Sequence, residues 1–206
     1  DVPAMLLELL SHQNLADQRF GLDPRFRFQV ARSVYKGILR YISYTEDKQF
    51  IVQPLPVSNF AITPVSGKRI RLSWEPVHDS LEPSANPDRF VLYMRRGNEG
   101  FDNGTALFTN RTELELDSFN TIYSFRVTAA NEGGESLDSE ILSVGLLQND
   151  EKPVLVVNGF DRVCAPSMFD TGNMAGVAWW DDRGVADHVE ITGTGDQYDY
   201  DRRSPW

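Results

Sequence analysis

Apolar residues alternate with polar ones in the middle of the chain, a pattern typical of half-buried strands. Between residues 57 and 147 the alternating runs are separated by turn signals rich in Gly, Pro and Ser, at the spacing of an all-β sandwich. Three inward rows stand out: Ile70, Leu72 and Trp74; Phe90, Leu92 and Met94; and Tyr123, Phe125, Val127 and Ala129. The pattern predicts about seven short antiparallel strands packed as two sheets.

The pattern changes before this region. Val2–Leu10 is a nearly continuous apolar run that contains one charge, Glu8, and it predicts a strand buried on both faces. Asp23 and Pro24 then supply an N-cap and a first-turn proline for a helix of about five turns. Apolar residues recur there at helical spacing: Ala31, Val34, Tyr35, Ile38, Leu39 and Ile42. One strand and one helix cannot bury two apolar faces, so we expect the rest of an α/β domain before Asp1.

Another apolar run opens the last part of the chain. Residues 153–157 lead into Asn158-Gly159 and predict a buried parallel strand at the start of a second α/β domain. Asn158 and Asp161 at its carboxyl end are candidates for a second site, with an ordinary turn as the commoner interpretation. The predicted organisation is thus residues 1–43, a linker at 44–56, a sandwich at 57–147 and a second α/β segment at 148–206. The predicted fold class is mainly β with partial α/β flanks.

Composition narrows the range of partners. The net charge of −10 argues against a nucleic-acid-binding protein, because phosphate binding rests on clustered Lys and Arg. No run approaches the ~18 apolar residues of a membrane span, so no membrane insertion is expected. Cys164 is the single cysteine, which excludes an internal disulfide and a cysteine-based zinc site. Acidic residues near the end of the chain lack EF-hand spacing and are interpreted as a solvated face together with His188: Asp181, Asp182, Asp187 and Glu190.

Two motifs in the central region resemble strands of fibronectin type III domains. They are Leu72-Ser73-Trp74-Glu75-Pro76 and the run from Tyr123 to Ser136. The resemblance implies an immunoglobulin-like β-sandwich with Trp74 in its core and a tyrosine corner, in which the Tyr123 hydroxyl bonds back to the chain just upstream. Such modules serve as spacers, adhesion units and carbohydrate-associated scaffolds, so function stays open. The loops Phe101–Gly104 and Pro83–Pro87 are candidate binding loops, although most such loops are merely solvated. His78 is expected to be an exposed loop residue.

The first segment carries a second resemblance. The Val2–Leu10 run, Asn14 and the Asp23-Pro24 helix with Tyr35-Lys36-Gly37-Ile38 resemble the last strand and last helix of zinc-dependent N-acetylmuramoyl-L-alanine amidases. This implies that Glu8 is catalytic, beside a zinc ion held by two histidines and a glutamate that would lie upstream of Asp1, so this chain alone would hold no cofactor. Periodicity alone leaves an alternative, in which Glu8 is paired with a helix N-terminus or a basic neighbour. His12 is expected to be a loop residue and no ligand.

The order of these segments resembles that of large exported proteins of the Bacteroides type, labelled xanthan lyases or cell-wall amidases. Residues 156–162 and 197–206 contribute to this likeness. It implies a fragment of an exported, multidomain cell-envelope enzyme whose partner is peptidoglycan or another polysaccharide. A polysaccharide lyase and a non-catalytic binding or spacer protein are the competing hypotheses. The sequence leaves the oligomeric state open.

Overall fold

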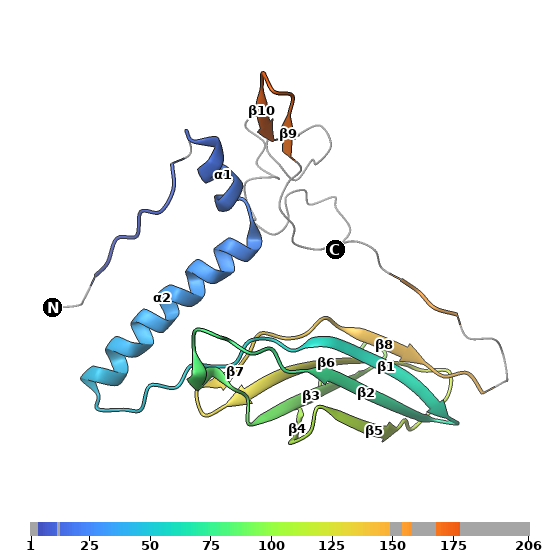
Figure 1. Cartoon of the computed structure of the whole chain (residues 1–206). Helices are drawn as coiled ribbons and strands as arrows, with labels where there is room; N and C mark the ends of the chain where they lie inside the picture. Colours follow the sequence, from blue (N-terminus) through green and yellow to red (C-terminus); the bar gives the residue numbers. More distant parts are fainter. Residues whose placement is uncertain (1–3, 12, 149–153, 158–167, 178–206) are drawn as a thin grey trace. The chain divides into compact units, whose positions relative to one another are not determined.

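The computed structural model describes residues 4–11, 13–148, 154–157 and 168–177. A two-sheet β-sandwich lies within a compact unit of residues Ile38–Val154 (Figure 1). One sheet has the order β1-β2-β5, with bounds Ser58–Ser66, Arg69–Glu75 and Arg111–Glu115. The other has the order β4-β3-β6-β7, with bounds Thr105–Leu107, Arg89–Arg96, Ile122–Asn131 and Gly134–Glu135, and β8 (Leu142–Gly145) also pairs with β6. All these pairs are antiparallel, which confirms the predicted fold class.

The predicted inward rows form most of the core of the sandwich, together with Val57, Phe60 and Leu116, whereas Met94 at the end of its row is half-buried. In β2, Ile70 and Leu72 are fully buried, while the alternating Arg69 and Arg71 are exposed. The same alternation places Phe90 and Leu92 of β3 in the core. In β6 the inward residues Tyr123, Phe125, Val127 and Ala129 are all buried. Side chains on one face of a strand share one environment because the pleat has a period of two, so the sequence pattern was sufficient to place them.

The Trp74 indole is buried in this core. Its ring meets Phe90 at 5.5 Å and Phe60 at 6.4 Å between centroids, both edge to face. At the far end of the core, the hydroxyl oxygen of Tyr123 accepts a hydrogen bond from the backbone N–H of Ser118 at 3.2 Å. Both roles that the sequence predicted for these residues, the core indole and the tyrosine corner, are therefore confirmed.

In the segment that connects β7 to β8, two serine hydroxyls hold the chain against β6. The Oγ atoms of Ser136 and Ser139 accept the backbone N–H groups of Ala129 and Val127, each at 3.0 Å. Each hydroxyl then donates to the carbonyl oxygen of the residue that follows it in the chain. A side-chain oxygen thus replaces a ladder carbonyl at each position, and this is why one edge strand is divided into two short ones.

The chain just before β1 is part of the sandwich. Val52 and Pro54 are fully buried and Val57 is 8% exposed, so the second half of the predicted linker is packed. Nδ2 of Asn131 donates to the carbonyl oxygens of Val52 at 2.9 Å and Ser84 at 3.0 Å, and lies 3.3 Å from that of Asn86. These contacts tie three distant parts of the chain together at one end of the sandwich.

Gly133 allows the chain before β1 to come this close to the turn after β6. A Cβ atom on Gly133 would lie 2.5 Å from the carbonyl oxygen of Ile51. Any side chain at this position would therefore push the packed segment away from the turn.

The first segment differs from its prediction. Residues 4–10 form no strand, and Met5 and Leu6 are 69% and 82% exposed, so the predicted doubly buried strand is wrong for these residues. An apolar run indicates only that burial is favourable; the strands that would cover this run are not among the described residues. A short helix that the sequence did not predict, α1 (Leu15–Gly21), follows, with the Asn14 side chain accepting the N–H of Ala16 as its N-cap.

The predicted helix is confirmed as α2 (Pro24–Thr45), with 22 residues. Oδ1 of Asp23 accepts the backbone N–H of Arg25 at 2.9 Å, as an N-cap does. The apolar face of α2 lies open in part, since Ile38 and Tyr41 are 52% and 53% exposed.

The third segment also departs from expectation. Residues 154–157 form no strand, and their four side chains are at least 74% exposed, so the predicted buried parallel strand is wrong here. Farther along, β9 (Met168–Asp170) and β10 (Ala175–Val177) pair as an antiparallel hairpin. Asn158, Asp161, Cys164 and the acidic residues from 181 to 190 lie outside the described residues.

Replacing Asn131 by alanine is expected to lower the free energy of unfolding by about 2 to 3 kcal/mol, because it leaves buried carbonyl oxygens without a donor. Urea denaturation of the chain followed by tryptophan fluorescence measures the loss. Asn98→Ala, in an exposed turn, is the matched control and should change stability by less than about 0.5 kcal/mol. Equal stability of the two variants would contradict the bridging role of Asn131.

Candidate functional site

Glu8, the predicted catalytic residue, is exposed within residues 4–10. No described residue forms a hydrogen bond or an ion pair with the Glu8 carboxylate. The described residues therefore provide neither a catalytic neighbour for Glu8 nor the partner that the paired-carboxylate alternative requires. His12 lies outside the described residues. The described residues also contain no cluster of three His, Cys, Asp or Glu side chains able to hold a metal ion. They therefore do not form a zinc site around Glu8.

The Phe101–Gly104 loop, one of the two candidate binding loops, is held in place by side-chain contacts. Phe101 lies between two guanidinium groups, with the Cζ atoms of Arg95 and Arg126 at 5.0 and 4.6 Å from its ring centroid. Oδ1 of Asp102 accepts the backbone N–H groups of Met94 and Gly104. These contacts fix the Phe101–Gly104 loop on the outer face of the sheet.

The Pro83–Pro87 loop also has internal order. Pro83–Ala85 forms a 3-10 turn, and Ala85 is 1% exposed. The side chain of Asn86 donates through Nδ2 to the carbonyl oxygen of Pro83 at 3.1 Å. The loop is therefore held by its own contacts, and Asn86 and Pro87 line one side of a cleft.

A polar and aromatic network covers the outer face of β3 and β6. The Glu135 carboxylate accepts hydrogen bonds from the Tyr93 hydroxyl at 2.8 Å and from the Thr128 hydroxyl at 2.7 Å. Arg126 pairs with Asp138 and also lies over the Tyr93 ring, 4.8 Å from its centroid. Burial raises the pKa of Tyr93 above its usual value of 10.0, and the hydrogen bond to Glu135 adds to this increase. These hydrogen bonds and the ion pair stabilise this face of the sheet, although the buried Nε of Arg126 has no hydrogen-bond partner among the described residues.

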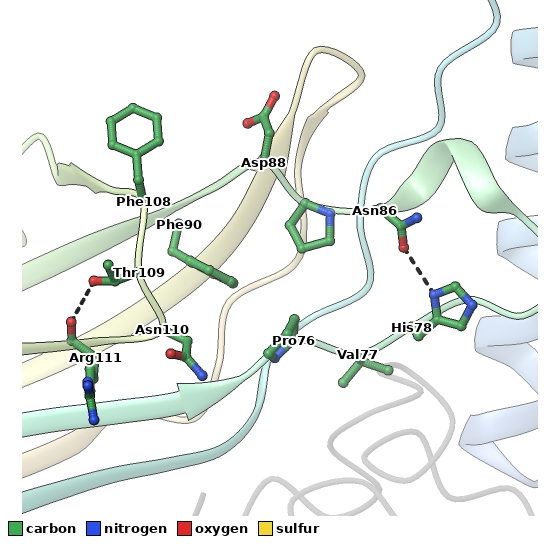
Figure 2. Close-up of a pocket in the computed structure, with 11 residues that line it drawn as sticks. Pro76, Val77, His78, Asn86, Asp88, Phe90, Phe108, Thr109, Asn110 and Arg111 are labelled. Carbon is green, nitrogen blue, oxygen red and sulfur yellow. Dashed lines mark hydrogen bonds between the residues drawn. The ribbon is translucent and has the colours of Figure 1, made fainter.

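A cleft of about 730 Å³ opens where the loops after β2, before β3 and after β4 meet (Figure 2). Its lining combines apolar and polar side chains: Pro76, Val77, His78, Asn86, Pro87, Asp88, Phe90, Phe108, Thr109, Asn110 and Arg111. Figure 2 shows Phe108 on one side of the cleft and the His78–Asn86 pair on the other. The sequence identified His78 only as an exposed loop residue, which is confirmed, and did not identify Phe108, Asn110 or Arg111.

The side chain of Asn86 contacts one ring nitrogen of His78. Because Nδ2 of Asn86 donates to Pro83, its Oδ1 is the acceptor that lies 3.0 Å from Nδ1 of His78. This contact is compatible with a proton on Nδ1 of His78. The contact with Asn86 orients the exposed His78 ring at one side of the cleft (Figure 2).

The topology and core packing of the sandwich agree with a family comparison. Residues 55–145 match the family model described as "Fibronectin type III domain". The chain contains a fibronectin type III domain. No curated protein is similar enough in sequence to the chain to be matched.

Several solved structures are similar to part of the chain at low sequence identity. The twitchin kinase region from C. elegans is 20% identical, with a TM-score of 0.42, and the match covers 49% of this chain and 18% of that one. The FN1–FN3 domains of chicken CNTN1 are 15% identical, with a TM-score of 0.42, over 49% of this chain and 34% of theirs. An FN3 domain of human collagen XX is 22% identical, with a TM-score of 0.36, over 46% of this chain and 96% of that one. The chain thus spans less than a fifth of the twitchin region's length.

The ionisation of Tyr93 tests the network on the outer face of the fibronectin type III domain. Because the folded-state pKa is raised, the stabilisation from this group is fully present below about pH 10 and is lost as the pH rises through the folded value. The difference in tyrosinate absorbance between the native chain and Tyr93→Phe should show one tyrosine that ionises above 10.0. Glu135→Gln should lower its midpoint, whereas Glu113→Gln on the other sheet should leave it unchanged. An unchanged midpoint in Glu135→Gln would contradict the assigned contact.

Proposed function

We propose that the fibronectin type III domain is a rigid spacer that holds its flanking segments apart in a multidomain protein. The chain enters the domain beside Asn131, where Nδ2 contacts the carbonyl of Val52, and leaves it where Gly145 of β8 pairs with Ile122 of β6. Ile122 and Asn131 are the two ends of the ten-residue strand β6. At roughly 3.3 Å per residue, entry and exit are about 30 Å apart. This separation is the observation that supports the spacer role.

The contact between Asn131 and the chain before β1 supports the same role. Val52 is fully buried, and Ile51 lies too close to Gly133 for a side chain at that position, so residues 51 and 52 are held against the end of the domain. A spacer needs such a fixed joint, because a flexible linker sets only a broad range of distances.

Distance measurement between spin labels tests the spacer. The variant Gln49→Cys/Gln148→Cys, with Cys164→Ser to remove the native thiol, places labels at entry and exit. Double electron–electron resonance should give a narrow distribution centred at or above about 30 Å. The control pair Gln49→Cys/Glu132→Cys has both labels at the entry end and should give a much shorter distance. A spacer pair as short as the control, or a distribution as broad as that of a flexible coil, would contradict the proposal.

A finer proposal places the chain in an exported cell-envelope enzyme that hydrolyses amide bonds of peptidoglycan. Its support is the likeness of residues 2–10 and 23–38 to the end of a zinc-dependent N-acetylmuramoyl-L-alanine amidase domain. Glu8 would then position a water molecule and accept its proton as the water oxygen attacks the amide carbonyl. The residues that the structure describes contain no cluster able to hold a zinc ion.

Glu8→Gln tests this finer proposal in a chain that also includes the residues preceding Asp1. Release of peptides from insoluble peptidoglycan is expected to fall roughly 10²- to 10⁴-fold, because an amide cannot accept the proton of the attacking water. Glu99→Gln, at an exposed turn of the fibronectin type III domain, is the control and should retain full activity. Full activity in Glu8→Gln would remove Glu8 from the mechanism. Formation of an unsaturated uronate from an acidic glycan would instead favour the competing lyase hypothesis.

A further inference from the structure

The loop between β3 and β4 contains an asparagine followed by a glycine, Asn103-Gly104. In such a pair the backbone nitrogen of the glycine can attack the side-chain Cγ atom of the asparagine, because glycine has no side chain to obstruct the approach. A new C–N bond closes a succinimide ring, the bond to the side-chain nitrogen breaks, and ammonia leaves with the proton of the glycine amide. Water then opens the ring to give aspartate or isoaspartate. Asn103-Gly104 is therefore a reactive pair in the unfolded chain.

The folded domain needs a glycine at position 104. Gly104 has a φ angle of 78°, and a Cβ atom there would lie 2.5 Å from Cγ1 of Val91 and 2.7 Å from Cε1 of Tyr93. Any other residue would be strained by this backbone conformation and would collide with β3. The packing of the loop thus requires the residue that makes Asn103 reactive.

The side chain of Asn103 does not limit the reaction. Asn103 is exposed, and its amide forms no hydrogen bond with any residue that the structure describes. The carbon atom that is attacked is therefore accessible. Control by the fold must act on the attacking nitrogen of Gly104.

Asp102 holds this nitrogen. The N–H of Gly104 donates to Oδ1 of Asp102 at 3.0 Å. The same oxygen accepts the N–H of Met94 at 3.1 Å, and the N–H of Asp102 donates to the carbonyl oxygen of Met94 at 2.9 Å, so Asp102 is itself fixed on β3. A carboxylate is far too weak a base to remove an amide proton. The charge-assisted hydrogen bond therefore keeps the proton on Gly104 and the nitrogen turned away from Asn103.

Ring closure also requires the loop to leave β3. The backbone of Gly104 lies against the side chains of Val91 and Tyr93, so its nitrogen cannot rotate in place. The same loop is held by Phe101, whose ring lies between two guanidinium groups. Hydrogen bonding and packing thus oppose the reaction together in the folded state.

We propose that Asn103 is a deamidation site that the folded domain keeps inactive, with Asp102 as the residue that suppresses the reaction. Deamidation places a second carboxylate beside Asp102, and isoaspartate adds one backbone atom just before Thr105, which pairs with Leu92. The modification therefore loosens β4 from β3 and records how long the loop has been open. No residue of the spacer joint or of the amidase-like segment takes part, so the proposal is independent of both.

Peptide mapping by mass spectrometry, after incubation of the whole chain in mildly alkaline buffer, measures the deamidation rate at Asn103. The native chain is expected to react at least about tenfold more slowly in buffer than unfolded in urea, because the hydrogen bond must first break. Asp102→Ala is expected to raise the rate in buffer by about tenfold or more and to leave the rate in urea unchanged. Asp102→Asn keeps a side-chain oxygen and should give a smaller increase.

Phe101→Ala is the matched control, because it removes another contact of the same loop and leaves the hydrogen bond between Gly104 and Asp102 in place. Its rate should stay closer to that of the native chain than to that of Asp102→Ala. Tryptophan fluorescence shows which variants are folded in buffer. Hydrogen exchange at the Gly104 amide tests the native chain without any substitution. The slowing of deamidation should be at least as large as the protection of this amide, since both processes require its release.

Three results would overturn the proposal. Equal rates for the native chain in buffer and in urea would show that the fold gives no protection. An unchanged rate in Asp102→Ala, or an equal increase in Phe101→Ala, would remove Asp102 from its suppressing role. A slowing of deamidation smaller than the exchange protection would show that the reaction does not depend on release of the Gly104 N–H.

Discussion

The edge-to-face packing of Trp74 with Phe90 and Phe60 joins the two sheets, and the rest of the domain is positioned from it. The indole comes from β2 and Phe90 from β3, so burying the two rings together fixes how the sheets face each other. The backbone of the same residue extends this order to the surface. The N–H of Trp74 holds the carbonyl of Asn110, and the turn that contains Asn110 also carries Phe108 and Arg111. The geometry of the cleft is thus set by the residue that organises the core.

Where the chain enters the domain, the buried side chain of Asn131 holds neighbouring segments together by hydrogen bonds. Asn131 provides donors for backbone carbonyls of Val52 and Ser84, and its own Oδ1 accepts the N–H of Gly133 at 2.8 Å. Apolar contacts alone tolerate small displacements, whereas a buried amide with several partners specifies one arrangement. The position of Val52 against the domain is therefore fixed by a hydrogen bond as well as by apolar contacts.

The flanking segments show the limit of apolar patterns. Residues 4–10 and 154–157 are as apolar as the inward rows of the sandwich, yet they are exposed and form no strand. A strand needs a hydrogen-bonded neighbour, and the described residues supply none for either run. The pattern thus reports the chemistry of a segment, while its structure also depends on which other segments are beside it.

The sequence by itself determined the central fold. The alternation of Ile70, Leu72 and Trp74 and the position of Tyr123 could be recognised because strand period and corner motif are local features of the chain. The N-cap of α2 at Asp23 was predictable for the same reason. Only the tertiary structure decided that Asn131 binds the carbonyl of Val52 across 79 positions of the chain, and that His78 and Phe108 share a cleft. These neighbours are brought together by sheet topology and loop packing, which involve long-range pairing that no local period encodes.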